Sequence, residues 1–260
     1  MSVVDLLKYV RTLPPSERIL VVTHVNADPD AVATALVVRE VLAALGFNAV
    51  ACFPGGISRV SRDLLERLGI NYESSCECRA RYVVVCDASN EAVLGEAAAC
   101  LAGAAGVMII DHHEAGSLAG RASVAVIEPG EPAATTLAVE LAQAAEVRLS
   151  PQLASLALGG ILYDTKRFMA ASPRTLRAAA WLLESGGQYE QALPKPEEEL
   201  DYSERVARLK AAQRAVLVDV CGHIVAVSEV TAYEASAARA LVSLGADLSL
   251  IHISEPTRPY

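Results

Sequence analysis

The chain has few aromatic residues and no excess of positive charge. Phe, Trp and Tyr make up 5% of its 260 residues, and 31 Asp and Glu outnumber 22 Lys and Arg, which gives a formal net charge of −9. Proteins bind duplex nucleic acid mainly through clustered Lys and Arg that neutralise phosphates. The charge balance therefore argues against a surface for duplex nucleic acid, whereas a local cation site could still attract a short phosphate-bearing molecule.

Long apolar runs are missing as well. Hydrophobic residues account for 53% of the chain, but no stretch reaches the roughly 18 apolar residues that span a membrane. The longest candidate, 97–110, is interrupted by Gly103 and Gly106, and the N-terminus has neither the charge pattern nor the cleavage site of a secretory signal. We therefore expect a cytoplasmic globular protein without a membrane partner, and its length favours two domains.

Cysteine pairs with metal-binding or redox spacing are also absent. The six cysteines are scattered, and the one tight pair, Cys76 and Cys78, encloses one residue instead of the two of a CxxC motif. Four of the six lie in apolar surroundings, where a reduced thiol packs as a small hydrophobe. We expect neither a metal site nor a disulfide at Cys76 and Cys78.

Apolar strands alternate with helical segments in the first half of the chain. β-branched or apolar runs typical of buried strands are followed by breaker-free, helix-forming stretches. The strands are predicted at 19–22, 48–53, 81–87 and 107–110, and the helices at 1–13, 31–45, 61–68, 91–101, 135–145, 151–163 and 173–185. This alternation predicts an α/β fold with a parallel sheet flanked by helices on both faces.

The composition changes in the last quarter of the chain. The segment PKPEEE at 194–199 mixes proline with a charge run, so we predict a linker over 191–204. It would join a first domain at 1–190 to a smaller, incomplete α/β domain at 205–260. The elements predicted for this last part of the chain are a helix at 201–214, a hairpin of 215–220 and 223–227, and a helix at 235–244. We expect 248–260, a proline-broken polar tail, to reflect a truncation or non-native residues.

Acidic and histidine residues follow several of these elements. The stretch THVNADPDA at 23–31 follows the first strand, and VVVCDAS, IIDHHEAG and ILYDTKRF each deliver Asp or His to a strand or helix end. Each residue alone could be a helix cap or a hydrogen-bonded turn residue. Because ligands of such sheets lie beyond the carboxyl ends of the strands, and because crowded carboxylates repel one another unless cations are present, the four segments together predict a metal site.

These four segments, in this order, resemble the DHH phosphoesterase superfamily, whose Asp-His-His signature stands here as Asp111, His112 and His113. The first segment matches the H-x-N-x-D-x-D pattern of that family, with Ala27 where a proline is usual. The likeness extends over roughly residues 1–245. The run 159–168, with the SPRTLRAAAWLLESGG that follows, is most similar to the small nanoRNases, which trim very short RNAs and often remove a phosphate from phosphoadenosine phosphate.

The resemblance implies a site with two metal ions and a bridging carboxylate. One ion would be held by His24, Asp28 and Asp87, and the other by Asp30, Asp87, His112 and Asp164. His113 would face the substrate phosphate or the leaving oxygen, and Asp111 would orient the neighbouring histidines. Candidate substrate contacts are Asn26, Lys166 and Arg167, the last two of which could equally form a solvated helix end.

Four carboxylates and two imidazoles form a hard donor set, which suits two Mn²⁺ ions, with Mg²⁺ or Co²⁺ as lesser candidates. We therefore predict a Mn-dependent hydrolase, either a phosphodiesterase with exonuclease activity or a phosphatase, acting on short single-stranded RNA or small nucleotides. A pyrophosphatase or exopolyphosphatase of the same superfamily is the alternative enzyme, and a non-catalytic nucleotide-binding module is the alternative outside the enzymes. Whether the chain forms a homodimer stays open.

Overall fold

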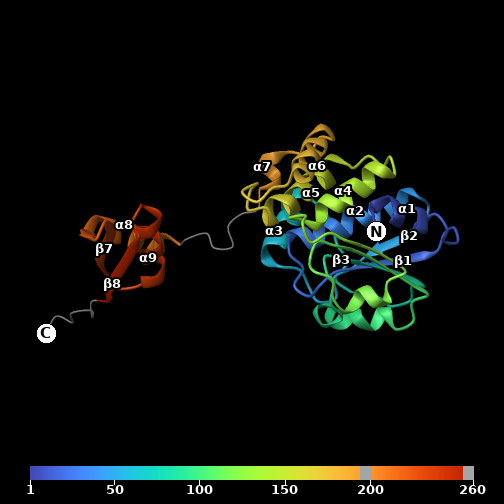
Figure 1. Ribbon diagram of the computed structural model, residues 1–260, viewed down its shortest axis with the longest axis horizontal. Coiled ribbons are helices and arrows are strands. Elements are labelled where there is room, and N and C mark those ends of the chain that lie inside the picture. Colours follow the sequence, from blue (N-terminus) through green and yellow to red (C-terminus); the bar gives the residue numbers. More distant parts are fainter. Residues whose placement is uncertain (76, 194–200, 254–260) are drawn as a thin grey trace. The chain divides into compact units, whose positions relative to one another are not determined.

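The computed structural model describes residues 1–75, 77–193 and 201–253 of the protein, and the chain divides into two compact units, Met1–Glu197 and Glu198–Tyr260 (Figure 1). Half of the predicted linker, 194–200, lies outside the described residues, as do Cys76 and 254–260. Within the described part of the chain, no helix combines the length and the apolar character needed to cross a membrane.

The first unit is built on a five-stranded parallel sheet with the order β2-β1-β3-β4-β5. Its strands are β1 (Arg18–Val22), β2 (Asn48–Ala51), β3 (Tyr82–Cys86), β4 (Gly106–Asp111) and β5 (Val124–Ile127). The residues of β3 and β4 are buried throughout, as expected for apolar strands covered on both faces. The predicted α/β fold is confirmed, whereas β5, an apolar strand of only four residues, was not predicted.

Helices cover one face of this sheet. They are α1 (Val3–Val10), α2 (Pro29–Ala44), α3 (Arg59–Leu68), α4 (Ala134–Ala144), α5 (Pro151–Asp164), α6 (Pro173–Glu184) and the short α7 (Tyr189–Ala192). Residues of α2, α4 and α5 pack with inward-facing residues of β1, β3 and β4 in one large apolar core. Serine caps and a following proline open α5 and α6, which explains why both helices were visible in the sequence.

The other face of the sheet carries the 3₁₀ helices η1 (Glu91–Leu101) and η2 (Ser117–Arg121) over a second apolar core. The predicted helix at 91–101 is present with the same bounds, as a 3₁₀ helix. Gly95 adopts φ 55° and ψ −129°, a conformation outside the helical region, and interrupts the segment.

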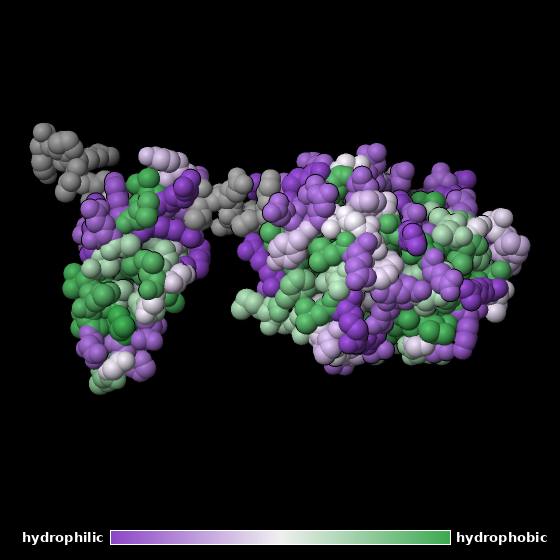
Figure 2. Space-filling view, turned by 90° about the horizontal axis from the view of Figure 1, so that it is seen from above, coloured by the Kyte–Doolittle hydropathy of each residue, from purple (hydrophilic) through white to green (hydrophobic). Residues whose placement is uncertain are grey.

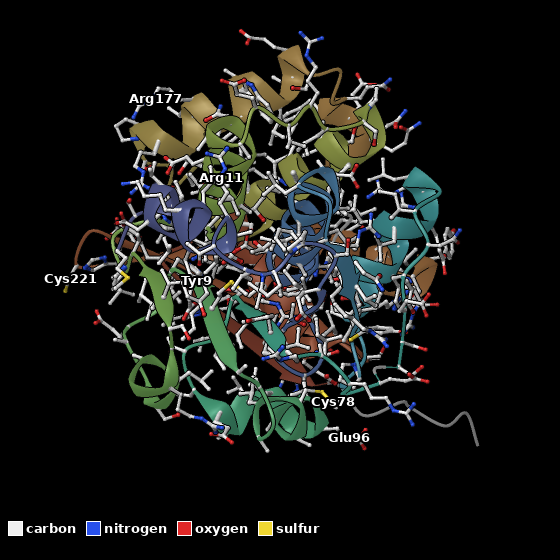
Figure 3. All side chains as sticks on the ribbon, turned by 90° about the vertical axis from the view of Figure 1, so that its right-hand side faces the viewer. Tyr9, Arg11, Cys78, Glu96, Arg177 and Cys221 are labelled. Carbon is white, nitrogen blue, oxygen red and sulfur yellow. A yellow bond between two sulfur atoms is a disulfide. The ribbon has the colours of Figure 1, made fainter. Side chains whose placement is uncertain are left out.

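A disulfide joins Cys78 to Cys100 at the end of η1, and Figure 3 labels Cys78 in this region. The expectations that Cys78 takes part in no disulfide and that Cys100, in its apolar surroundings, is a reduced thiol are therefore wrong. The two residues are separated by 22 positions in the sequence, so the pairing depends on a tertiary contact and leaves no local spacing signal. Cys86 and Cys221 are free thiols, the first buried and the second exposed.

The second unit is a three-stranded sheet packed against two helices. β6 (Val216–Val220) and β7 (His223–Val230) form the predicted antiparallel hairpin, and α8 (Tyr202–Arg214) and α9 (Glu234–Ser243) lie near the predicted positions. The interpretation of 248–253 as part of a polar tail is wrong. These residues form β8 (Leu248–Ile253), which pairs in parallel with β7; four of the six are Leu or Ile, residues that pack well on a sheet surface.

The two faces of the small sheet differ in burial. On one face Ala226, Ser228 and Val230 are buried against the helices, and the Ser228 hydroxyl donates to the Ala211 carbonyl of α8 at 2.7 Å. The alternate residues lie on the opposite face, where Val216, Val218, Val220, Val227, Leu248 and Leu250 are exposed. Hydrophobic side chains gather on the surface of this unit in Figure 2.

Candidate metal centre

The turn after β1 supplies the first group of ligands. Asp28 is the N-cap of α2, and its Oδ1 accepts hydrogen bonds from the backbone N–H of Asp30 and of Ala31, each at 3.0 Å. This cap fixes the first helical turn and places Asp30 in the interior with no exposure to solvent. The Nδ1 of His24 lies 2.8 Å from the Val25 carbonyl, so that Nε2 is directed to Asp87, 3.6 Å from its Oδ2.

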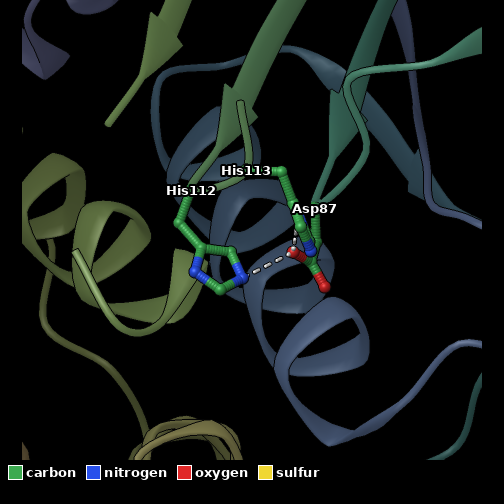
Figure 4. A group of neighbouring side chains, drawn as sticks. All are labelled: Asp87, His112 and His113. Atoms are coloured by element: carbon green, nitrogen blue, oxygen red, sulfur yellow. Dashed lines mark ion pairs between the residues drawn. The ribbon is translucent and has the colours of Figure 1, made fainter. Parts of the chain in front are cut away.

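Asp87 lies at the centre of the cluster. It follows β3 with φ 55°, a left-handed conformation that is uncommon for a non-glycine residue, and its backbone N–H donates to the Ile110 carbonyl at 2.9 Å. Its Oδ1 lies 3.4 Å from Nε2 of His112 and 3.5 Å from Nδ1 of His113 (Figure 4). The turn thus directs one carboxylate at three imidazoles from two different segments.

Asp111 holds the two histidines that follow it. It is the last residue of β4 and is fully buried. Its Oδ1 accepts from the backbone N–H of His112 at 2.8 Å, from that of His113 at 3.2 Å, and from Nδ1 of His113 at 2.8 Å. These contacts fix the direction of both rings. The expected role of Asp111 and His113 in turnover stays a prediction.

The orientation of His112 depends on Glu131, which the sequence analysis missed. Nδ1 of His112 lies 3.0 Å from the Glu131 carbonyl and donates to it, which leaves Nε2 as the free ligand atom. That atom lies 3.3 Å from Oδ2 of Asp164 and 3.9 Å from Oδ2 of Asp30. Because Glu131 acts through its backbone carbonyl, its residue type gave no signal.

Asp30 is held by the N-terminus of α4. Its Oδ2 accepts from the backbone N–H of Ala134 at 2.7 Å, and its Oδ1 accepts from that of Thr135 at 3.0 Å. The N-cap residue of α4 is Ala133, which has no side-chain cap, so Asp30 satisfies helix donors that would otherwise be unpaired. The positive end of the helix dipole also stabilises this buried carboxylate.

The ligand atoms fall into three overlapping groups, each with all its atoms within 4.8 Å of one another. The groups are His24, Asp28 and Asp87; Asp30, His112 and Asp164; and Asp87, His112 and His113. Oδ1 of Asp87 and Nε2 of His112 are buried without a hydrogen-bond partner. Buried polar atoms normally have a partner, and these two point into a set of carboxylate and imidazole donors, so the residues fit divalent cations.

Crowding changes the acidity of the carboxyl groups. Burial and the nearby charge of Asp87 raise the pKa of Asp28, and burial with the charges of Asp87 and Asp164 raises the pKa of Asp30 well above its usual value. Burial and the charges of Asp28 and Asp87 raise the pKa of Asp164 to about 7. These three carboxyl groups therefore resist ionisation beside the others, which is the effect a bound cation would reverse.

The histidines shift in the opposite sense to that expected from burial. Burial lowers the pKa of both, but contact with the Asp87 carboxylate raises the pKa of His24 to about 9 and, together with the charge of Asp30, that of His112 to about 10. Burial likewise opposes ionisation of Asp87, yet the two imidazoles lower its pKa below the ordinary range. Protons on the imidazoles thus partly neutralise the acidic cluster in the absence of metal ions.

A cavity of about 650 Å³ opens beside the cluster. Its lining includes five predicted site residues, together with six residues that the sequence analysis did not single out. The predicted ones are His24, Asp28, Asp87, His113 and Asp164, and the others are Val25, Ala88, Ser89, Asn90, Val93 and Glu114.

The structure does not bring the candidate substrate contacts to this cavity lining. Asn26, Lys166 and Arg167 are all exposed, have positive φ angles, and are not among the residues that line it. Their role in substrate binding stays a prediction.

The profile of the DHH family, N-terminal domain, matches residues 18–161, more than half of the chain and the part that contains the Asp111-His112-His113 signature. The protein belongs to the DHH family. Members of this family are metal-dependent hydrolases of the phosphoesterase superfamily, in agreement with the acidic and histidine groups described above.

Three relatives illustrate the range of this DHH protein's similarity. It is 27% identical over 256 residues to the uncharacterized protein MJ0988 of Methanocaldococcus jannaschii, covering 95% of this chain and 74% of that protein. An exopolyphosphatase-related protein from Bacteroides fragilis shares the fold with a TM-score of 0.66 at 14% identity, over 87% of this chain and 69% of its own. The exonuclease RecJ bound to manganese gives a TM-score of 0.42 at 20% identity, over 71% of this chain and 46% of the RecJ chain.

Proposed function

We propose that this DHH protein is a phosphoesterase that uses two divalent cations, Mn²⁺ in the first place, to hydrolyse phosphoester bonds of short single-stranded RNA or small nucleotides. One observation supports this most directly: Asp87 and His112 each belong to two of the three groups of ligand atoms. Each also has one buried atom without a hydrogen-bond partner, Oδ1 of Asp87 and Nε2 of His112. A residue shared between two such groups is the geometry expected of a bridge between two ions.

The side chains divide naturally between two sites. His24, Asp28 and Asp87 would hold one ion, and Asp30, Asp87, His112 and Asp164 the other. Four carboxylates balance the charge of two divalent cations, which leaves the cavity able to accept an anionic phosphate. When bound, the cations supply Lewis acidity that activates a water molecule and stabilises the charge of the transition state.

His113 is suited to act on the leaving group. Its Nδ1 is fixed by the Asp111 carboxylate at 2.8 Å, while its side chain is 56% exposed and lines the cavity. The other ring nitrogen, Nε2, is therefore left for the substrate. In this position it can donate a proton to the leaving oxygen, and the buried Asp111 keeps the ring in the required orientation.

Hydrolysis of a substrate panel under Mn²⁺, with and without chelator, tests this function. The panel contains a 5′-phosphorylated diribonucleotide, adenosine 3′,5′-bisphosphate and inorganic pyrophosphate. We expect chelator-sensitive cleavage of the nucleotides, and we expect Asp87→Ala to lower kcat by about 1000-fold or more, because the substitution removes a ligand of both ions.

A matched variant and two outcomes complete this test. Glu96→Gln, which removes an exposed carboxylate outside the cavity, should leave kcat unchanged. Unaltered turnover in Asp87→Ala would refute the assigned centre. Faster cleavage of pyrophosphate than of either nucleotide would favour the pyrophosphatase alternative instead.

A further inference from the structure

Two exposed valines stand beside the metal ligands inside the cavity. Val25 follows His24 in the turn after β1, and Val93 lies in η1; both line the cavity, with exposed fractions of 42% and 40%. The backbone N–H of Val25 donates to the Val93 carbonyl at 2.8 Å, so the two residues lie side by side. We call this pair the valine shelf.

Close backbone approaches hold the shelf in position. A Cβ atom on Gly55 would lie 2.6 Å from Cα of Val25, and one on Gly95 would lie 2.5 Å from its Cγ1. Gly95 is also the residue whose φ of 55° interrupts η1. Two segments thus approach Val25 at distances that only glycine allows. Val25 is therefore fixed by the fold on two sides while its remaining surface is open to the cavity.

The charge of the cavity restricts what the shelf can bind. Within the parts of the chain that the structure describes, the lining contains no Lys or Arg, and its titratable members are His24, Asp28, Asp87, His113, Glu114 and Asp164. A second phosphate group away from the cations would find no positive side chain here. An uncharged, flat and largely apolar group next to the scissile phosphate is better matched, because it removes apolar valine surface from water.

We propose that the valine shelf binds the nucleobase of a nucleotide whose phosphate is at the metal centre, and so makes the enzyme selective for nucleoside phosphoesters over phosphate chains. This inference rests on the proposed phosphoesterase function and names the part of the substrate that gives specificity. The shelf is a specificity determinant and contributes to substrate binding through the base.

The test compares substrates that differ only in the base. We measure kcat/KM under Mn²⁺ for a 5′-phosphorylated diribonucleotide and for its analogue with an abasic 5′ residue. The wild-type enzyme should prefer the base-bearing substrate by about 10-fold in kcat/KM. Val25→Thr and Val93→Thr should each reduce this preference by about 3-fold, through a higher KM, because a hydroxyl replaces a methyl group of similar volume and makes the surface less apolar. Val4→Thr, at an exposed valine of α1 outside the cavity, should change nothing.

A second measurement keeps the inference testable without turnover. Binding of uncharged 2-aminopurine riboside to the chelated protein, followed by fluorescence, should weaken about 3-fold in each shelf variant and stay unchanged in Val4→Thr. Equal kcat/KM for the base-bearing and abasic substrates, or riboside binding unaffected by both shelf variants, would overturn the shelf while leaving the phosphoesterase intact. Absence of cleavage of either substrate, with riboside binding still dependent on the shelf, would overturn the proposed function alone.

Discussion

At the scale of single residues, the centre depends on side chains that never face the cavity. Glu131 is buried, and its carboxylate accepts hydrogen bonds from the hydroxyls of Ser172, at 3.0 and 2.9 Å, and of Thr175, at 2.5 Å. Those two residues form the capping box of α6. The side chain of Glu131 is therefore held by α6, while its backbone carbonyl orients His112. Partners of this kind set ligand geometry as firmly as the ligands themselves.

Replacing Glu131 by Gln tests this connection. The Ser172 hydroxyl contacts both carboxylate oxygens and the Thr175 hydroxyl contacts one of them. An amide offers one acceptor oxygen and no negative charge, so at least one of these charge-assisted contacts is lost, and we expect the free energy of unfolding to fall by about 1–2 kcal/mol. We also expect the affinity for Mn²⁺ to fall by about 10-fold, measured by calorimetry, because the carbonyl that orients His112 is then fixed less firmly to α6. Glu96→Gln is the control. A loss of stability with unchanged Mn²⁺ affinity would contradict the positioning role.

At the scale of elements, the site depends on how closely α5 approaches α2 and α4. Asp164 is the last residue of α5, while Asp30 lies in the first turn of α2. A Cβ on Gly160 would lie 2.7 Å from Oγ1 of Thr135, 2.8 Å from Cβ of Ala33 and 2.9 Å from the Pro29 carbonyl. The absent side chain at Gly160 thus lets three helices meet and brings the two carboxylates to one cluster.

We expect Gly160→Ala to destabilise the protein by about 1–3 kcal/mol through overpacking, although alanine favours a helix by about 1 kcal/mol over glycine. Displacement of α5 should also move Asp164 and lower Mn²⁺ affinity. Denaturant unfolding and calorimetry check both effects. Gly103→Ala is the matched control, since no atom lies within 4 Å of its added Cβ. A stabilised Gly160→Ala variant would show that the helices have room to separate.

At the scale of the whole molecule, the titration of the cluster links the stability of the first unit to pH. The pKa values of His24 and His112 are raised to about 9 and about 10, so the stability they contribute is fully present below their ordinary value of 6.5 and is lost as pH rises through the raised values. The raised pKa of Asp164, about 7, acts in the same direction, because its protonated form is favoured in the fold. Metal-free protein should therefore lose stability as pH rises.

We expect the melting temperature of the chelated protein to fall by about 3 °C or more between about pH 6 and about pH 9, and Mn²⁺ to remove most of this decrease by replacing the lost protons. Fluorescence of the single tryptophan, Trp181 in α6, reports on the first unit alone. A melting temperature that rises over this range without metal would contradict the assigned titrations.

Part of the fold was predictable because its signals are local. The apolar runs of β1, β3 and β4 and the serine–proline starts of α5 and α6 are properties of adjacent residues, and the hairpin of β6 and β7 turns at Cys221 and Gly222, both with positive φ. The same holds for the site positions His24, Asp87 and Asp111-His112-His113, which lie at or just after the ends of strands. The distances between these side chains, however, cannot be predicted from any one segment.

The features missed by the sequence analysis all depend on contacts between distant residues. Disulfide Cys78–Cys100 links a loop to the end of η1, β8 gains its strand partner from β7, and η1 loses regular α-helical geometry where Gly95 approaches Val25. Glu131 reaches His112 across 19 positions through a backbone atom. None of these interactions changes the residue pattern around the partners, so local reasoning could not find them.

The sequence by itself determined the parallel α/β architecture, the membership of the DHH family, and which segments deliver acids and imidazoles to one sheet edge, since periodicity and motif spacing are properties of the chain alone. Tertiary structure alone decided how closely Asp87 approaches the three histidines, that α4 and Glu131 hold Asp30 and His112, and that valines rather than basic residues border the centre. Those outcomes depend on distances of 2.7–3.6 Å between segments far apart in the sequence, and only the packing of the folded chain sets such distances.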